Sequence, residues 1–129
     1  MNDIDLAGTE STPRIRADWS AGRLEMSGDS YPENSFELFQ PVLDWIAAFL
    51  ADGGRPLTLE LRLLYLNTSS VRAMMEIFDT LQDAHEAGRE VAVAWRYDGS
   101  NERVADLASE FKEDYTFPFD IVPGRETCL

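Results

Sequence analysis

The sequence is poor in the residue types on which common catalytic and metal sites depend. Its 129 residues include one cysteine and one histidine. Cys128 has no second cysteine with which to form an internal disulfide or a cysteine metal cluster. His85 falls at the end of a predicted helix, and neither a glycine-rich phosphate loop nor a transition-metal spacing of ligands occurs. We therefore predict no catalytic residue, no metal site and no cofactor, with a small enzyme that uses paired carboxylates as one alternative.

Basic residues and long hydrophobic runs are also scarce. The formal net charge is −13, and one lysine and ten arginines are scattered along the chain. Nucleic acids and anionic membrane surfaces are bound through clusters of basic side chains, so we expect neither as a partner. The longest apolar run, residues 45–50, is too short to span a bilayer, and the acidic start does not resemble a signal peptide. We expect a cytoplasmic protein without direct membrane insertion.

The composition is nevertheless that of a folded protein. Hydrophobic residues make up 44% of the chain and aromatic residues 11%, which is enough for the core of one domain. We assign this domain to residues 13–123. Residues 1–12 are polar and are expected to form a flexible N-terminal arm, and residues 124–129 a C-terminal tail.

Hydrophobic periodicity changes several times within the domain. Apolar and polar residues alternate over residues 15–19 and 23–27, around a glycine-containing turn, and predict a β-hairpin. Later segments alternate between the period of a strand and that of a helix. The predicted helices cover residues 36–50, 71–85 and 104–115, and the later strands cover residues 57–66, 91–97 and 117–122. This order predicts an α/β fold, with a mostly parallel sheet, helices packed on it and the hairpin at one edge.

Two segments carry more specific expectations. Asn34 and Glu37 have the spacing of a capping box, but Pro41 requires the first helix either to kink there or to begin there. In the strand at residues 57–66, alternation gives way to apolar residues on both faces at Leu64 and Leu66. We expect the far half of this strand to be covered on both faces.

One amide and three hydroxyl side chains, Asn67-Thr68-Ser69-Ser70, form a cluster where this inner strand ends and a helix begins, which we call the hydroxyl cluster. Such residues are preferred as helix N-caps because their oxygens accept hydrogen bonds from the free N–H groups of the first turn. Alternatively, one hydroxyl is a covalent switch, since a phosphate would be favoured at a helix N-terminus. The two interpretations are compatible if one side chain caps the helix and another is modified.

Several segments of the chain have a specific rather than a generic pattern. They are Gly8-Thr9, Thr12-Pro13-x-Ile15, Gly28-Asp29-Ser30-Tyr31-Pro32-Glu33-Asn34, Leu63-x-Tyr65-Leu66-Asn67-Thr68-Ser69-Ser70 and Asn101-Glu102. Together they resemble the SiaC family of bacterial biofilm-regulation phosphoproteins over nearly the whole chain. More distantly, a phosphorylatable hydroxyl at a strand-to-helix junction is similar to STAS-type antagonists of anti-sigma factors. Those proteins typically carry Asp-Ser-x-Gly at this junction, from which Asn67 and Ser70 depart.

The resemblance implies a STAS-like domain that acts as a non-enzymatic switch. It implies that a SiaB-like Ser/Thr kinase phosphorylates Thr68 and that a SiaA-like PP2C phosphatase removes the phosphate. The unphosphorylated form would bind and activate a SiaD-like GGDEF diguanylate cyclase, raising cyclic di-GMP and favouring biofilm. We expect the partner-binding residues to be Asn67, Ser69, Ser70, Arg72, Tyr31 and Asn34. The alternative is a STAS-like anti-sigma factor antagonist in a partner-switching pathway.

Overall fold

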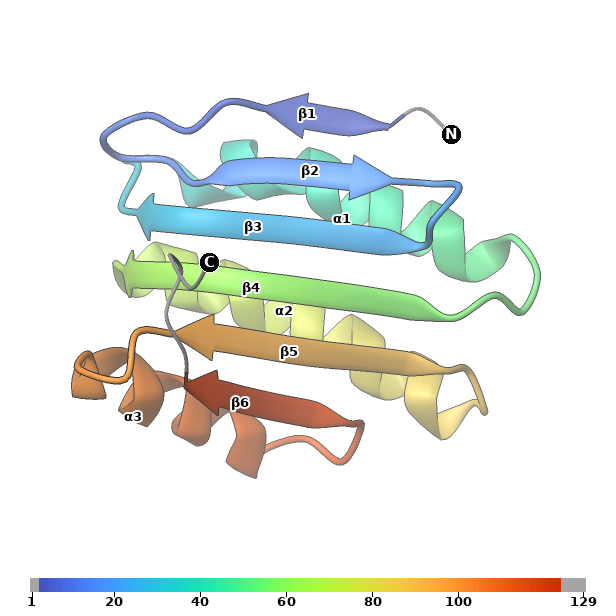
Figure 1. The fold of residues 1–129 in the computed structure, drawn as a ribbon. Coiled ribbons are helices and arrows are strands. Elements are labelled where there is room, and N and C mark those ends of the chain that lie inside the picture. Colours follow the sequence, from blue (N-terminus) through green and yellow to red (C-terminus); the bar gives the residue numbers. More distant parts are fainter. Residues whose placement is uncertain (1–2, 124–129) are drawn as a thin grey trace.

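Strands and helices alternate along most of the chain in the computed structural model, which describes residues 3–123 (Figure 1). The strands of this part of the chain are β1 (Ile4–Leu6), β2 (Arg14–Asp18), β3 (Arg23–Ser30), β4 (Leu57–Leu66), β5 (Val91–Tyr97) and β6 (Phe119–Pro123). Its helices are α1 (Ser35–Ala51), α2 (Thr68–Glu86) and α3 (Glu102–Glu113). Each predicted helix and strand is present, with ends that differ by a few residues.

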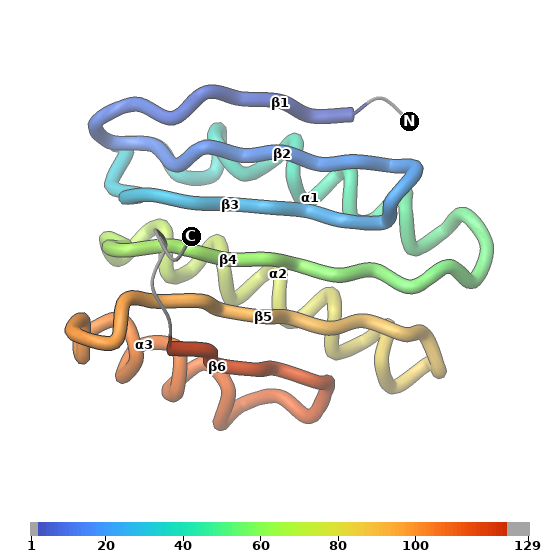
Figure 2. The backbone as a smooth tube through the Cα atoms, viewed as in Figure 1, coloured from blue at the N-terminus to red at the C-terminus, as the bar shows by residue number. Residues whose placement is uncertain are grey.

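The strands lie in the sheet in the same order as in the chain, from β1 to β6. The first three strands are antiparallel, and β3 to β6 are parallel. Parallel crossovers are right-handed, and the three crossovers here advance across the sheet in one direction. All three described helices therefore cover the same face of the sheet, as Figures 1 and 2 show. The predicted α/β fold, with a mostly parallel sheet and the hairpin towards one edge, is confirmed.

The other face of the sheet carries no helix in the described part of the chain, so one expectation is wrong. The far half of β4 is not covered on both faces, because Leu64 is 51% exposed and Tyr65 is 54% exposed. The pairing with β3 shifts between Gly28 and Asp29, whose partners are Leu63 and Tyr65. This β-bulge leaves Leu64 as an extra residue. The unbroken apolar run at the end of β4 thus reflects an inserted residue rather than burial from two sides.

The hydrophobic core fills the space between the sheet and the helix layer. Alternate residues of β4 point into it, and aromatic side chains from the helices meet them. Trp45 stacks on Phe49 of α1 with ring centroids 5.5 Å apart, and Trp95 of β5 stacks on Phe111 of α3 at 5.8 Å. Each buried side chain of this size contributes about 1.5–3 kcal/mol. The core thereby fixes the ends of the strands and the starts of the helices relative to one another.

Helix α1 begins where the capping box predicts. The side-chain oxygen of Asn34 accepts a hydrogen bond from the Glu37 backbone N–H at 3.1 Å, and the Asn34 amide donates to the Glu37 carboxylate at 3.2 Å. The helix runs through Pro41 rather than starting there. Pro41 lies on the exposed side of the helix, where water can reach the carbonyl that lost its hydrogen bond.

The segment predicted as a flexible arm contributes a strand. Residues of β1 pair antiparallel with β2, with Ile4 opposite Ala17 and Leu6 opposite Ile15. The Trp19 backbone N–H also donates to the Asp3 carboxylate at 2.8 Å. The predicted tail, residues 124–129, lies outside the described residues. Between residues 3 and 123, no helix is both long and apolar enough to cross a bilayer.

Candidate functional site

The hydroxyl cluster lies at the junction of β4 and α2, where the structure gives Asn67 the role of N-cap. The Asn67 side-chain oxygen accepts a hydrogen bond from the Ser70 backbone N–H at 2.9 Å. Its amide group donates to the Pro32 carbonyl at 3.2 Å, and its backbone N–H donates to the Ser30 carbonyl at 2.9 Å. Asn67 therefore caps α2 and also ties the junction to the loop that follows β3.

A network of serine hydroxyls reinforces this tie. Ser30, Ser35 and Ser70 are buried. The Ser70 hydroxyl lies 2.7 Å from that of Ser30 and 3.1 Å from that of Ser35, and the Ser69 hydroxyl lies 2.7 Å from that of Ser35. Because buried polar groups are costly unless they are hydrogen-bonded, these contacts hold the two loops in one arrangement.

Ser30 and Ser35 are site residues that the sequence analysis missed. They lie in and next to the turn-rich loop before α1, some 34 to 40 positions from the serines that they contact. For Ser30 the available signal was its place at the end of a parallel strand, because such ends gather at the same edge of a sheet. Ser35 is the first residue of the helix that follows.

Thr68 differs from its neighbours in the cluster. It is the first residue of α2 and is exposed, whereas Ser70 is buried and Ser69 partly buried. The first turn of α2 contains no acidic residue, so the partial positive charge of the helix N-terminus is not offset there. Arg72 is exposed one turn further along the helix. An added phosphate at Thr68 would thus meet free N–H groups and a guanidinium on the same helix face.

Exposed apolar side chains lie around this junction. Tyr31 and Tyr65 are 44% and 54% exposed, and their rings meet edge to face with centroids 6.0 Å apart. Phe36, next to Ser35, is 48% exposed, and Met75 is 41% exposed. Both residues fit the three-and-four spacing of apolar residues in their helices, which would place them in the core, but the structure places them on the surface. Surface aromatic and methionine side chains of this kind are typical of protein-binding surfaces.

The predicted partner-binding residues are brought together only in part. Asn67, Ser69 and Ser70 form the junction, and Arg72 extends it along α2. Tyr31 reaches the junction through Tyr65, on the strand that leads into it. Asn34 also lies near it, but its side chain is engaged in capping α1.

Between residues 3 and 123, no group of three or more His, Cys, Asp or Glu side chains could hold a metal ion. Burial raises the pKa of Tyr115, and a hydrogen bond to Asp79 at 2.8 Å raises it further. Tyr115 lies after the end of α3, and its partner Asp79 is about three turns along α2 from Thr68. The arrangement at β4 and α2 is suited to presenting a hydroxyl group and an apolar surface to another protein.

Comparison with known proteins supports this conclusion. Residues 6–124 match the model of a family described as SiaC family regulatory phosphoprotein. An uncharacterized protein of Pseudomonas aeruginosa strain UCBPP-PA14 is 64% identical over 121 residues, which cover 94% of this chain and 96% of that protein.

Solved structures show the same similarity. The structure of SiaC of Pseudomonas aeruginosa superposes with a TM-score of 0.91 at 60% identity, covering 96% of this chain and all of that chain. A chain in the crystal structure of the diguanylate cyclase SiaD in complex with its activator SiaC, from the same organism, superposes with a TM-score of 0.92 at 62% identity. That match covers 95% of this chain and all of the other.

Proposed function

Because this chain belongs to the SiaC family of regulatory phosphoproteins, we propose that it activates a diguanylate cyclase and is switched off by phosphorylation of Thr68. One observation carries the proposal. This protein is 62% identical to a chain in the structure of the diguanylate cyclase SiaD with its activator SiaC, and the match covers all of that chain. The role is one of binding rather than catalysis. Activation by contact needs a surface, and the exposed aromatic side chains beside the junction supply one.

Exposure and hydrogen bonding both favour Thr68 as the modified residue. Ser70 is buried and contacts two other hydroxyls, and Ser69 is hydrogen-bonded to Ser35 and to the Asn67 side chain. Modifying either serine would break the network that joins the loops. Thr68 is exposed, and its phosphorylation would leave that network intact.

Electrostatics explains how one phosphate could prevent binding. It adds about −1.5 to −2 charges at the N-terminus of α2, where the helix dipole and Arg72 stabilise it in the isolated protein. At a partner contact the same charge is desolvated and left unpaired, which costs several kcal/mol. A loss of about 2.8 kcal/mol already weakens binding a hundredfold. The switch therefore acts on the contact and not on the fold.

We propose that the docking surface includes Asn67, Ser69, Ser70, Arg72, Tyr31 and Asn34, together with Tyr65 and Phe36. A Ser/Thr kinase and a PP2C-type phosphatase complete the proposed switch. Its place of action is the cytoplasm, because ATP and GTP, the substrates of the kinase and the cyclase, are available there.

The test is the activity of the purified cognate diguanylate cyclase with this protein in each phosphorylation state. Unphosphorylated protein is expected to raise the rate of cyclic di-GMP formation, and protein phosphorylated at Thr68 to leave it at the basal value. Protein treated with the kinase without ATP is the matched control. A cyclase whose rate is the same with and without the unphosphorylated protein would refute the proposed function.

A further inference from the structure

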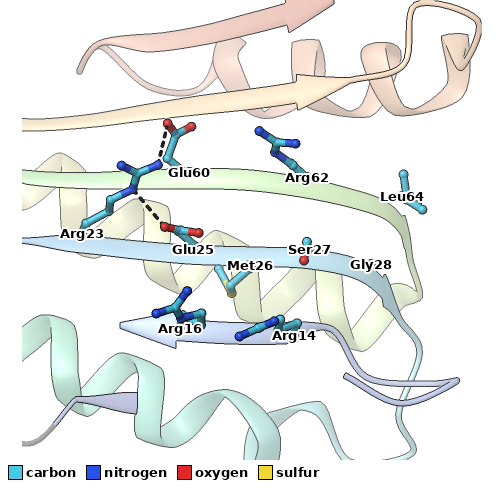
Figure 3. Close-up of a pocket in the computed structure, with 10 residues that line it drawn as sticks. All are labelled: Arg14, Arg16, Arg23, Glu25, Met26, Ser27, Gly28, Glu60, Arg62 and Leu64. Carbon is cyan, nitrogen blue, oxygen red and sulfur yellow. Dashed lines mark hydrogen bonds and ion pairs between the residues drawn. The ribbon is translucent and has the colours of Figure 1, made fainter. Parts of the chain in front are cut away.

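A hollow of about 510 Å³ opens on the helix-free face of the sheet, across β2, β3 and β4 (Figure 3). Its charged lining consists of Arg14, Arg16, Arg23, Arg62, Glu25 and Glu60. The volume is in the range of about 300–1,000 Å³ that small-molecule sites occupy. We propose that this hollow binds a phosphate-bearing small molecule through its arginines.

The distribution of charge sets this face apart from the rest of the protein. Helices α1, α2 and α3 together carry ten acidic residues against three basic ones, whereas the strands carry six acidic residues against five arginines. Four of those five line the hollow, with two glutamates among them. An anion that is repelled by the overall charge of −13 therefore finds a local excess of positive charge here.

The register of the sheet arranges two of these arginines around a hydroxyl group. Ser27 of β3 is paired with Arg14 of β2 on one side and with Arg62 of β4 on the other. Neighbouring strands are about 4.8 Å apart, so the backbones of the two arginines are about 9.6 Å apart, with Ser27 between them. A guanidinium binds phosphate through two parallel hydrogen bonds, and the Ser27 hydroxyl can donate another.

The ion pairs on this face leave part of the positive charge available. Arg23 lies 3.1 Å from Glu25 and 3.3 Å from Glu60, so both glutamates already have a cationic partner. The pair of Arg14 with Asp5 is longer, at 3.6 Å, and both side chains are more than half exposed. Arg16 has no ion-pair partner within residues 3–123. Exposed pairs contribute little, so a phosphate can displace Asp5 from Arg14 at small cost.

The β-bulge forms the rim of the hollow. Gly28 and Leu64, the residues at the shift in register, both line it. Bulges re-aim side chains and occur frequently next to binding sites. Here the bulge places Leu64 on the open face as an apolar contact for the part of a ligand that carries no charge. Gly28 has a φ of +105°, a backbone conformation that residues other than glycine rarely adopt, so the bulge depends on this glycine.

This site is separate from the phosphorylation switch, because it lies on the open face and uses no residue of the junction at Thr68. The two proposals therefore fail independently. Binding is measured by isothermal titration calorimetry on the full chain, with sodium pyrophosphate, GTP and cyclic di-GMP as separate probes. Saturable binding of pyrophosphate would show that phosphate groups suffice. Binding of the guanine nucleotides alone would support a site in which arginine also contacts the guanine O6 and N7 atoms.

Variants locate the site. We expect Arg14→Glu and Arg62→Glu each to weaken binding of the probe about tenfold or more, since each replaces a phosphate contact by a repulsive charge. Arg103→Glu, which makes the same charge change at an exposed position of α3, should stay within about twofold. Circular dichroism checks that each variant is folded.

Three outcomes would overturn the proposal. The first is that no probe shows saturable binding up to about 10 mM. The second is that all three variants bind the probe equally well. The third is that a hexaglutamate peptide binds saturably at the hollow while no phosphate compound does. The last would assign the face to an acidic protein segment instead.

Discussion

The hydroxyl oxygen of Ser35 lies 2.7 Å from the hydroxyl oxygen of Ser69. This contact joins the first residue of α1 to the first turn of α2, so the starts of two neighbouring helices are held together beside Thr68. A partner that binds here meets a surface built from both helices, and the rigidity of that surface depends on buried serine hydroxyls.

Ser70→Ala should destabilise the protein by about 1–3 kcal/mol, because it leaves the buried hydroxyls of Ser30 and Ser35 with one partner fewer. The free energy of unfolding from urea titration measures this loss. Ser109→Ala, at an exposed position of α3, is the matched control and should change stability by less than about 0.5 kcal/mol. Equal stabilities of the two variants would show that the network contributes nothing.

Asn67→Ala should cost about 1–2 kcal/mol of stability, because α2 loses its N-cap. Asn67→Asp separates the two roles of this side chain. It keeps the capping oxygen but loses the amide that donates to the Pro32 carbonyl, so we expect a smaller loss. If the aspartate variant is as unstable as the alanine variant, the link to the loop after β3 matters more than the cap.

Thr68→Asp is expected to weaken binding of the diguanylate cyclase at least tenfold, while Thr68→Ala binds like the unsubstituted protein. The aspartate adds a charge at the proposed contact, but near a helix N-terminus it should not lower stability. Surface plasmon resonance measures the affinity, and thermal unfolding confirms that both variants are folded. Equal affinities would argue against exclusion by charge.

Incubation with the cognate kinase and MgATP should place one phosphate on Thr68, because the neighbouring serines are hydrogen-bonded and less accessible. Mass spectrometry of the digested protein locates the modified residue. Thr68→Ala should not be labelled, whereas Ser109→Ala should be labelled fully. Phosphate found only on Ser69, Ser70 or Thr12 would assign the switch to another residue.

Tyr65→Ser should weaken cyclase binding, because a half-exposed aromatic ring beside the junction would lose its contact with the partner. We expect a loss of about tenfold or more, with little change in stability. Leu6→Ser is the control, since Leu6 is also an exposed apolar residue but lies on β1, at the edge of the sheet. A similar effect of both substitutions would place the docking surface elsewhere.

The elements of this fold could be predicted because their patterns are local. The alternation in β4 and the spacing of three and four in α2 depend only on which face of each element is buried. The polar cluster between the end of β4 and the start of α2 could be recognised in the same way. The choice of Thr68 within that cluster, and the role of its hydroxyl group, came from the resemblance to a family.

Other features depend on the order of strands, which no local pattern contains. Leu64 was expected to be covered because an inserted residue in β4 has the same appearance in a sequence as a strand buried on both faces. Ser30 contacts Ser70 only because β3 and β4 are neighbours in the sheet. The grouping of arginines on the open face could not be predicted for the same reason, since Arg14 and Arg62 become neighbours of Ser27 only through strand pairing.

The sequential order of the strands has a consequence for how the site is made. Each described strand pairs only with the strand before or after it in the chain, so the sheet can grow from β1 towards β6 as the polypeptide leaves the ribosome. The contact of Ser30 with Ser70 closes only after β4 and the first turn of α2 have been synthesised. A kinase that recognises this junction would therefore find its substrate only in chains that have folded at least this far.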